Sequence, residues 1–103
     1  MLLYYVIHLK KLFLTKKRLM IIDKTIAVSD SGFVFNPTTG ESFSVNPIGV
    51  EIIELLKQDK TIDEINDSLF ERYNADIITI DKDVSDFINL LEQYSLIEKQ
   101  DAA

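Results

Sequence analysis

The sequence contains no cysteine, which excludes disulfide bonds, thiolate zinc sites and thiol nucleophiles. Its one histidine, His8, lies outside the acidic body of the chain, so the serines of that body have no histidine to activate them. Glycine is scarce too, and the loop over residues 36–40 has too little of it to surround a phosphate group. We therefore expect no catalytic residues, no metal and no cofactor. The missing cysteine fits a reducing compartment such as the cytoplasm.

Long apolar segments are also missing at the N-terminus. The apolar run over residues 2–7 is too short to span a bilayer, which needs about 20 residues. Basic residues follow this run, whereas a secretory signal carries them in front. We interpret residues 1–20 as a separate block of upstream sequence translated from an early start, with a frayed extension as the plainer option. An interfacial membrane helix that tethers the chain as an adaptor is the remaining alternative.

Acidic residues are absent from this block, and all 17 of them lie after Met20. From residue 21 onward, 6 basic residues stand against 17 acidic ones, which gives a net charge of −11. Such a body repels phosphate backbones, and this argues against nucleic-acid binding. A chain of 103 residues is long enough for one domain and too short for a second core.

Short extended segments make up the first part of the body. Alternating apolar residues predict a strand over residues 21–28. Two further strands, 33–35 and 42–45, flank a loop whose composition favours a tight turn. We expect three antiparallel strands with one apolar face, and we assign Phe33 and Phe35 to the core.

Clear capping signals introduce the first two helices. Asn46 is a good N-cap for the first helix, and the apolar stripe of this helix starts at Ile48. Gly49 costs about 1 kcal/mol in helix propensity, so we expect it to allow a close approach between helix and sheet. Residues 61–64 form a capping box for the second helix.

The third helix is predicted from residue 79 or 81 to about Tyr94 by apolar residues three and four apart. Residues 96–97 should then return to the core, and residues 99–103 should fray. Three acidic residues would fall in the first turn of this helix, where the helix dipole explains them without a catalytic or calcium-binding role. These residues are Asp81, Asp83 and Asp86.

The second strand of the hairpin has no obvious neighbour on its outer side. Edge strands normally carry lysine, proline or a bulge that prevents pairing with other chains. Residues 41–45 contain one glutamate and no such device. Either the third helix or the N-terminal block covers this edge, or the edge is kept open for a partner strand, and the residues alone leave both options open.

The body, residues 21–98, resembles the PqqD-like proteins in three segments: TGESFSVNPIGVEIIELL, KTIDEINDSLFERYNAD and VSDFINLLEQYSLI. The resemblance implies an α+β, winged-helix-like domain in which a three-stranded antiparallel sheet precedes three helices. Residues 1–20 then form an extension and residues 99–103 a tail. It also implies a peptide-binding chaperone that captures the leader segment of a ribosomally made precursor peptide and presents it to a modifying enzyme, often a radical-SAM protein. Ser95 stands where many of these sequences have glycine.

In this resemblance the leader pairs antiparallel with the outer strand of the hairpin and lies against the third helix. The strand residues are Glu41, Ser42, Phe43, Ser44 and Val45. The candidates for the groove wall are Val84, Phe87, Leu90, Leu91 and Tyr94, and Leu90 is preferred because it lies off the main apolar stripe. Two other roles stay open: a protein–protein interaction module that pairs edge to edge, giving a monomer or weak dimer, and the membrane-tethered adaptor.

Overall fold

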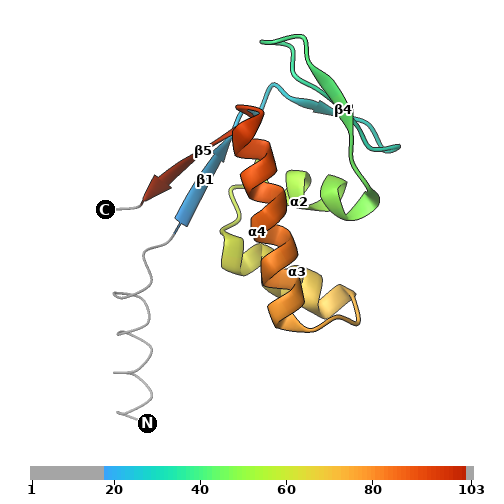
Figure 1. The fold of residues 1–103 in the computed structure, drawn as a ribbon, viewed down its shortest axis with the longest axis vertical. Helices are drawn as coiled ribbons and strands as arrows, with labels where there is room; N and C mark the ends of the chain where they lie inside the picture. The colour runs from blue at the N-terminus through green and yellow to red at the C-terminus, as the bar shows by residue number, and fades with distance from the viewer. Residues whose placement is uncertain (1–17, 102–103) are drawn as a thin grey trace.

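The computed structural model describes residues 18–101 and contains an antiparallel sheet followed by three helices. The elements, shown in Figure 1, are β1 (Arg18–Ile22), β2 (Ala27–Val28), β3 (Phe33–Phe35), β4 (Ser42–Ser44), α2 (Pro47–Lys57), α3 (Ile62–Arg72), α4 (Ile77–Gln93) and β5 (Ile97–Asp101). The three-stranded sheet has the order β2-β3-β4, which confirms the predicted α+β fold. Residues 1–17 of the N-terminal block, which include His8, lie outside the described residues, so our interpretation of them stays a prediction.

A second, two-stranded sheet joins the two ends of the described chain. β1 pairs antiparallel with β5, in a register that places Arg18 opposite Asp101 and Ile22 opposite Ile97. The predicted single strand over residues 21–28 is therefore wrong, because a turn divides it. At this turn the Asp23 carboxylate accepts hydrogen bonds from the main-chain N–H and the hydroxyl of Thr25. The predicted fraying is also wrong for residues 99–101, which belong to β5.

The register of the larger sheet decides which aromatic residues are buried. Residues directly opposite each other on an antiparallel pair share a face, and Val34 lies opposite Phe43. That face is the inner one, since Val34 is fully buried. Phe33 and Phe35 share the outer face with the two serines of β4 and are 49% and 39% exposed. Their assignment to the core was wrong, because alternation shows which residues share a face but not which face is covered.

The helix caps follow the sequence signals. The Asn46 side chain accepts a hydrogen bond from the Gly49 N–H (2.8 Å), and both hydrogen bonds of the capping box at Thr61 are present. The N-cap of α4 is Asp76, earlier than predicted, and its first turn contains no acidic residue. The attribution of the three later aspartates to the helix dipole is therefore wrong. At the other end of α4, Ser95 takes the left-handed conformation (φ 60°) at the position where glycine is common in the resembling sequences.

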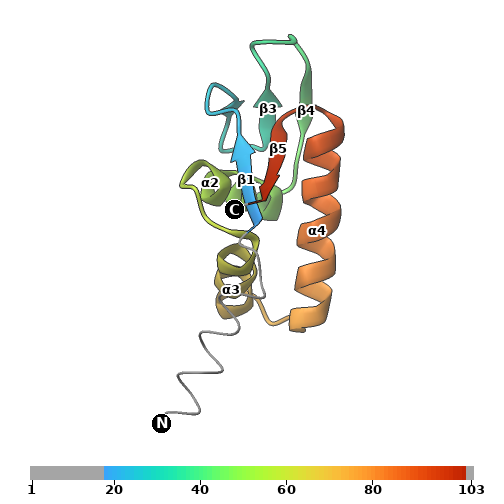
Figure 2. The ribbon, with the colours of Figure 1, turned by 90° about the vertical axis from the view of Figure 1, so that its left-hand side faces the viewer.

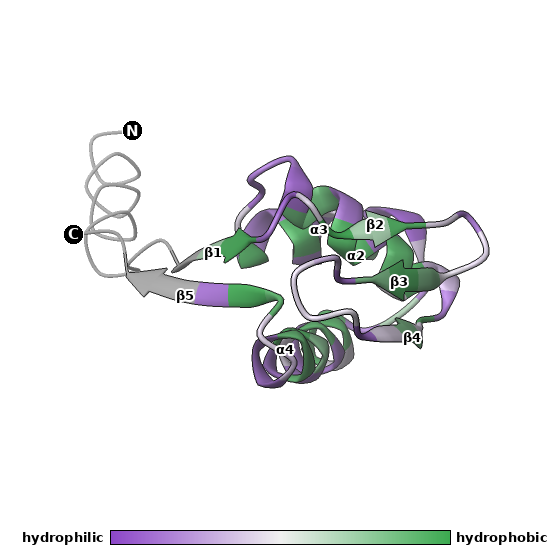
Figure 3. Ribbon diagram, turned by 90° about the horizontal axis from the view of Figure 1, so that it is seen from above, coloured by the Kyte–Doolittle hydropathy of each residue, from purple (hydrophilic) through white to green (hydrophobic). Residues whose placement is uncertain are grey.

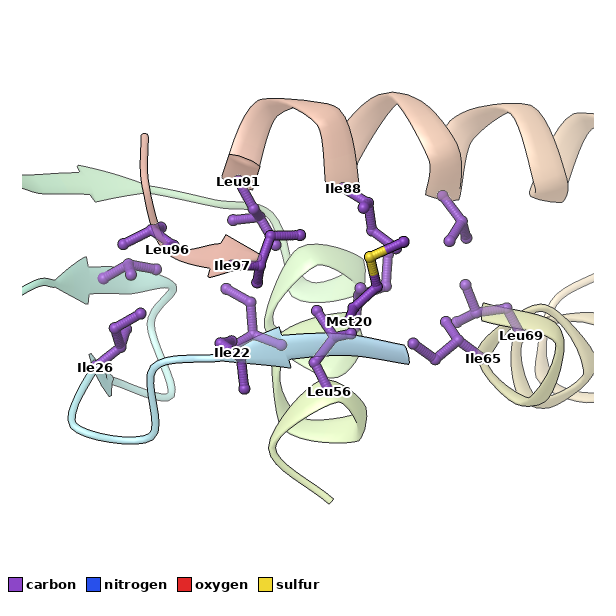
Figure 4. Close-up of a cluster of buried hydrophobic side chains, with 14 of the residues drawn as sticks. Met20, Ile22, Ile26, Leu56, Ile65, Leu69, Ile88, Leu91, Leu96 and Ile97 are labelled. Carbon is purple, nitrogen blue, oxygen red and sulfur yellow. The ribbon is translucent and has the colours of Figure 1, made fainter. Parts of the chain in front are cut away.

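The core lies between the helices and the β1–β5 pair. Hydrophobic and hydrophilic residues occupy different sides of α4 in Figure 3, and its hydrophobic side contributes to this core. Figure 4 shows the buried side chains from β1, β5 and all three helices in contact: Met20, Ile22, Ile26, Leu56, Ile65, Leu69, Ile88, Leu91, Leu96 and Ile97. The predicted return of residues 96–97 to the core is confirmed. In α2, Ile48 is an exception to the predicted stripe, since it is 39% exposed.

Candidate functional site

The outer edge of β4 is open along the described part of the chain. The sheet ends at β4, and Figure 2 shows this strand on the side of the hairpin nearest α4. The Val45 N–H donates to the Gly32 carbonyl oxygen (2.7 Å), and the Asn36 N–H donates to the Glu41 carbonyl oxygen (2.9 Å). Hydrogen-bonded pairs alternate along an antiparallel ladder, so the main-chain groups of Ser42 and Ser44 point away from β3.

These outward groups have no partner among residues 18–101. Neither Ser42 nor Ser44 makes a main-chain hydrogen bond on its outer side there, and both residues are exposed. The sequence left open whether the third helix or the N-terminal block covers this edge. The third helix, α4, does not pair with it, and residues 1–17 of the N-terminal block lie outside the described residues. An unpaired row of donors and acceptors is a template for another strand. Within residues 18–101, the outer side of β4 is therefore unpaired.

A groove of about 520 Å³ begins where β4 ends. Its lining comes from the start of α2, the end of α3 and one side of α4, and most of the lining residues are apolar. Gly49 forms part of the groove wall. The surroundings of Gly49 are tightly packed, since a Cβ atom there would lie 2.9 Å from Val45 Cβ and 3.2 Å from Phe87 Cζ. Gly49 therefore allows a close approach, but to α4 and to the residue that follows β4, whereas the sequence predicted an approach to the sheet.

The structure places the predicted groove-wall residues in two groups. Val84 and Leu91 are almost completely buried and belong to the core, although Val84 also reaches the floor of the groove. Phe87 is half-buried and Leu90 is 40% exposed, and both line the groove. Tyr94 stacks on Phe43, with ring centroids 5.4 Å apart. This aromatic pair joins β4 to the C-terminal end of α4, one turn beyond Leu90, which lines the groove.

Sequence reasoning missed several groove residues from other elements. Ile48 and Tyr73 line the groove, and Tyr73 donates a hydrogen bond from its hydroxyl to Glu51 Oε2 (3.0 Å). The other oxygen of Glu51 accepts a hydrogen bond from Arg72. The bond to the carboxylate raises the pKa of Tyr73, because the phenol loses a favourable contact when it ionises. Tyr73 follows Leu69 by four residues, and this spacing assigns it to the apolar positions of the second helix, but it does not indicate that Tyr73 lies beside α4.

Metal-binding clusters and membrane-spanning helices are both absent from residues 18–101. No group of three or more histidine, cysteine, aspartate or glutamate side chains could hold a metal ion. Over the same residues, no helix combines the length and the apolar character needed to cross a membrane.

Comparison with known proteins identifies the family. Residues 32–97, more than half of the chain, match the family described as Coenzyme PQQ synthesis protein D (PqqD). One similar solved structure is TbiB1 in complex with the TbiA(beta) leader peptide, with 28% sequence identity, a TM-score of 0.69, and coverage of 76% of this chain and 94% of that chain. Another is lasso peptide synthetase B1 complexed with the leader peptide (13% identity, TM-score 0.67, coverage 77% and 96%), which shows the fold alone. None of the curated proteins matches significantly. The chain belongs to the PqqD family.

Proposed function

We propose that this chain binds the leader segment of a ribosomally made precursor peptide by strand addition to β4. The observation that carries the proposal is the pair of outward-facing main-chain positions at Ser42 and Ser44, next to an apolar groove. Membership of the PqqD family supports it, as does the likeness to a structure whose partner is a leader peptide. The predicted strand residues, 41–45, form the docking edge.

The physical basis of binding is main-chain pairing combined with side-chain selection. An antiparallel guest opposite β4 can exchange two hydrogen bonds with each of Ser42 and Ser44. Each bond contributes about 0.5–1.5 kcal/mol net, and an extended peptide loses conformational freedom when it is ordered. We therefore expect a Kd near the micromolar range, about −8 kcal/mol. Phe43 and Tyr94 receive guest side chains at the edge, and Phe87 and Leu90 receive them in the groove.

The chain acts as a presenter, and the chemistry belongs to a partner enzyme. Residues 18–101 contain neither cysteine nor histidine, and their serines consequently have no general base of the usual kind. We assign the modification of the peptide to a separate enzyme, which in this family is often a radical-SAM protein. The groove-wall residues Val84 and Leu91 then serve indirectly, because they hold α4 at its distance from β4.

The test uses random 14-residue peptides displayed as a library, and the peptides enriched by the wild-type protein become the probes. Ser44→Pro removes the outward N–H and places a ring where the guest strand would lie, so we expect it to weaken these peptides at least tenfold. Circular dichroism and thermal unfolding check that the variant is folded. Unchanged binding by a folded Ser44→Pro protein would show that β4 is not the docking edge.

The guest provides a matched control of its own. Only every second N–H of an antiparallel guest faces β4, because hydrogen-bonded positions alternate. We expect N-methylation of successive peptide residues to divide them into two alternating classes, one that loses binding and one that keeps it. Equal effects at all positions would argue for a mode of binding other than strand addition.

A further inference from the structure

All charged residues that line the groove are acidic. Asp83 and Asp86 are its only charged residues, and both are exposed. Neither makes a hydrogen bond or an ion pair with any residue in the range 18–101. The basic Lys82 is next to them on α4 but does not line the groove, and Arg72 is engaged by a glutamate of α2.

Helix stability does not account for these two aspartates. The first turn of α4 contains no acidic residue, and Asp83 and Asp86 lie in the second and third turns. Favourable interaction with the helix dipole falls off within the first turn. The neighbouring Asp81 differs, because it accepts a hydrogen bond from Asn66 (2.8 Å) and so has a structural role. The two groove aspartates therefore line the space that a guest would occupy, with no partner among residues 18–101.

Along α4 the two aspartates lie farther from β4 than the apolar residues Phe87 and Leu90 do. The order along the helix is Asp83 and Asp86, then Phe87 and Leu90, which also line the groove, and then Tyr94, which stacks on Phe43 of β4 outside the groove. An antiparallel guest on β4 has its N-terminal side at the Val45 end, which is where the groove begins. A guest that continues into the groove therefore meets the aspartates with residues that precede its strand-forming segment.

We propose that the groove selects leader peptides that carry lysine or arginine about four to five residues before the residue at the Phe43–Tyr94 pair. This inference rests on the proposed function and adds a specificity to it. The spacing follows from geometry: Asp86 and Asp83 precede Tyr94 by 8 and 11 residues, or about 12 and 16 Å along a helix. An extended peptide rises about 3.3 Å per residue, so these distances correspond to about four and five residues.

The charge of the whole body acts in the same direction. The net charge of −11 from residue 21 onward raises the local concentration of a basic peptide and speeds its encounter with the groove. Exposed charge pairs contribute modestly to affinity, so the aspartates act mainly on selection and register. We expect Asp83→Asn/Asp86→Asn to weaken a basic peptide by about three- to tenfold at 0.15 M salt.

The experiment repeats the library selection with the double variant Asp83→Asn/Asp86→Asn. A control double variant, Glu54→Gln/Asp67→Asn, removes the same charge from exposed positions on α2 and α3 that do not line the groove. Wild type and control should enrich lysine or arginine four to five residues before the strand segment, and the groove variant should lose this enrichment while it keeps the apolar preferences.

Other outcomes separate this inference from the proposed function. Enriched peptides that depend on an intact Ser44 but show no basic preference, or the same preference with the groove variant, would overturn the inference alone. The absence of any peptide that depends on Ser44 would overturn both. A second measurement moves the basic residues of one enriched peptide to its C-terminal end. This peptide should bind wild type and groove variant equally, and continued sensitivity to the aspartates would contradict the proposed order.

Discussion

Gly32 lies in the turn between β2 and β3, opposite Val45, the residue that follows β4. Its φ is +91°, a conformation that side chains disfavour, and it is buried. A Cβ atom at this position would lie 2.1 Å from the carbonyl oxygen of Val45. The same two residues are joined by the hydrogen bond from the Val45 N–H to the Gly32 carbonyl. Gly32→Ala must therefore separate the two strands at the Val45 end of the proposed docking edge.

Gly40 offers a matched control for the cost of this separation. It also has a positive φ (+77°), but a Cβ there would meet nothing within 4 Å. Gly40→Ala should cost about 1 kcal/mol, since the left-handed penalty of about 1–2 kcal/mol is partly offset by a less flexible unfolded chain. Gly32→Ala adds the loss of a hydrogen bond, about 1 kcal/mol, and an overpacking term of about 1–3 kcal/mol. We expect a total of about 3–5 kcal/mol.

Thermal unfolding followed by far-UV circular dichroism measures both variants. For a domain of this size, 1 kcal/mol corresponds to about 4–8 °C in Tm, so Gly32→Ala should melt roughly 12–40 °C below wild type. Gly40→Ala should melt only a few degrees below it. Equal destabilisation of the two variants would refute the reasoning, because it would mean that backbone conformation alone, and not the contact with Val45, sets the cost.

Three further predictions concern α4 and the groove. Ser95→Gly should stabilise the protein by about 0.5–1 kcal/mol in urea unfolding, because glycine takes its left-handed conformation without strain, and a loss of stability would contradict this. Leu90→Ala should weaken peptide binding with little change in Tm, whereas the buried Leu91→Ala should cost about 2–5 kcal/mol of stability; the reverse pattern would remove Leu90 from the site. The raised pKa of Tyr73 means that its contribution to stability is complete below the usual value near 10 and is lost as pH rises through the raised value. Absorbance at 295 nm should show its titration moving to lower pH in Glu51→Gln, and an unshifted midpoint would argue against this hydrogen bond.

Local signals in the sequence were sufficient to predict the helices. The caps at Asn46 and Thr61 depend on contacts between residues three apart, and such contacts can be inferred from spacing alone. The start of α4 was placed two to four residues too late because the apolar period starts inside the helix, while its N-cap is Asp76. The consequence was a wrong explanation for the groove aspartates, which lie beyond the first turn.

Contacts between distant parts of the chain could not be predicted in this way. β1 and β5 are separated by the whole domain, and neither strand has a strong alternating pattern that would indicate its partner. The same limit applies to the hairpin faces. Whether Phe33 or Val34 is buried depends on which side of the sheet the helices cover, and this is decided by packing rather than by the local sequence.

The candidate site was predictable where it depends on the strand and less so where several elements meet. The edge was inferred from the absence of protective residues in β4, and α4 was inferred as one wall from the resemblance to a family. Ile48 and Tyr73 come from the start of α2 and the end of α3, and only the three-dimensional fold brings them together. Periodicity placed Leu90 off the helix stripe of Val84 and Leu91, and Leu90 is exposed where those two are buried. Periodicity could not show which members of the stripe also line the groove, as Phe87 and Val84 do.

The acidic body also explains how an open edge can persist without the usual protection. Two copies of this chain that approached through β4 would each bring a body with a net charge of −11, so electrostatic repulsion opposes edge-to-edge pairing. The shortness of β4, Ser42–Ser44, limits the number of hydrogen bonds that such a pair could gain. A basic peptide experiences attraction instead of repulsion, and it gains the groove contacts that a second copy of the strand would lack. Main-chain hydrogen bonding at β4 would be the same for a basic peptide and for a second copy of the chain, so charge is what discriminates between them.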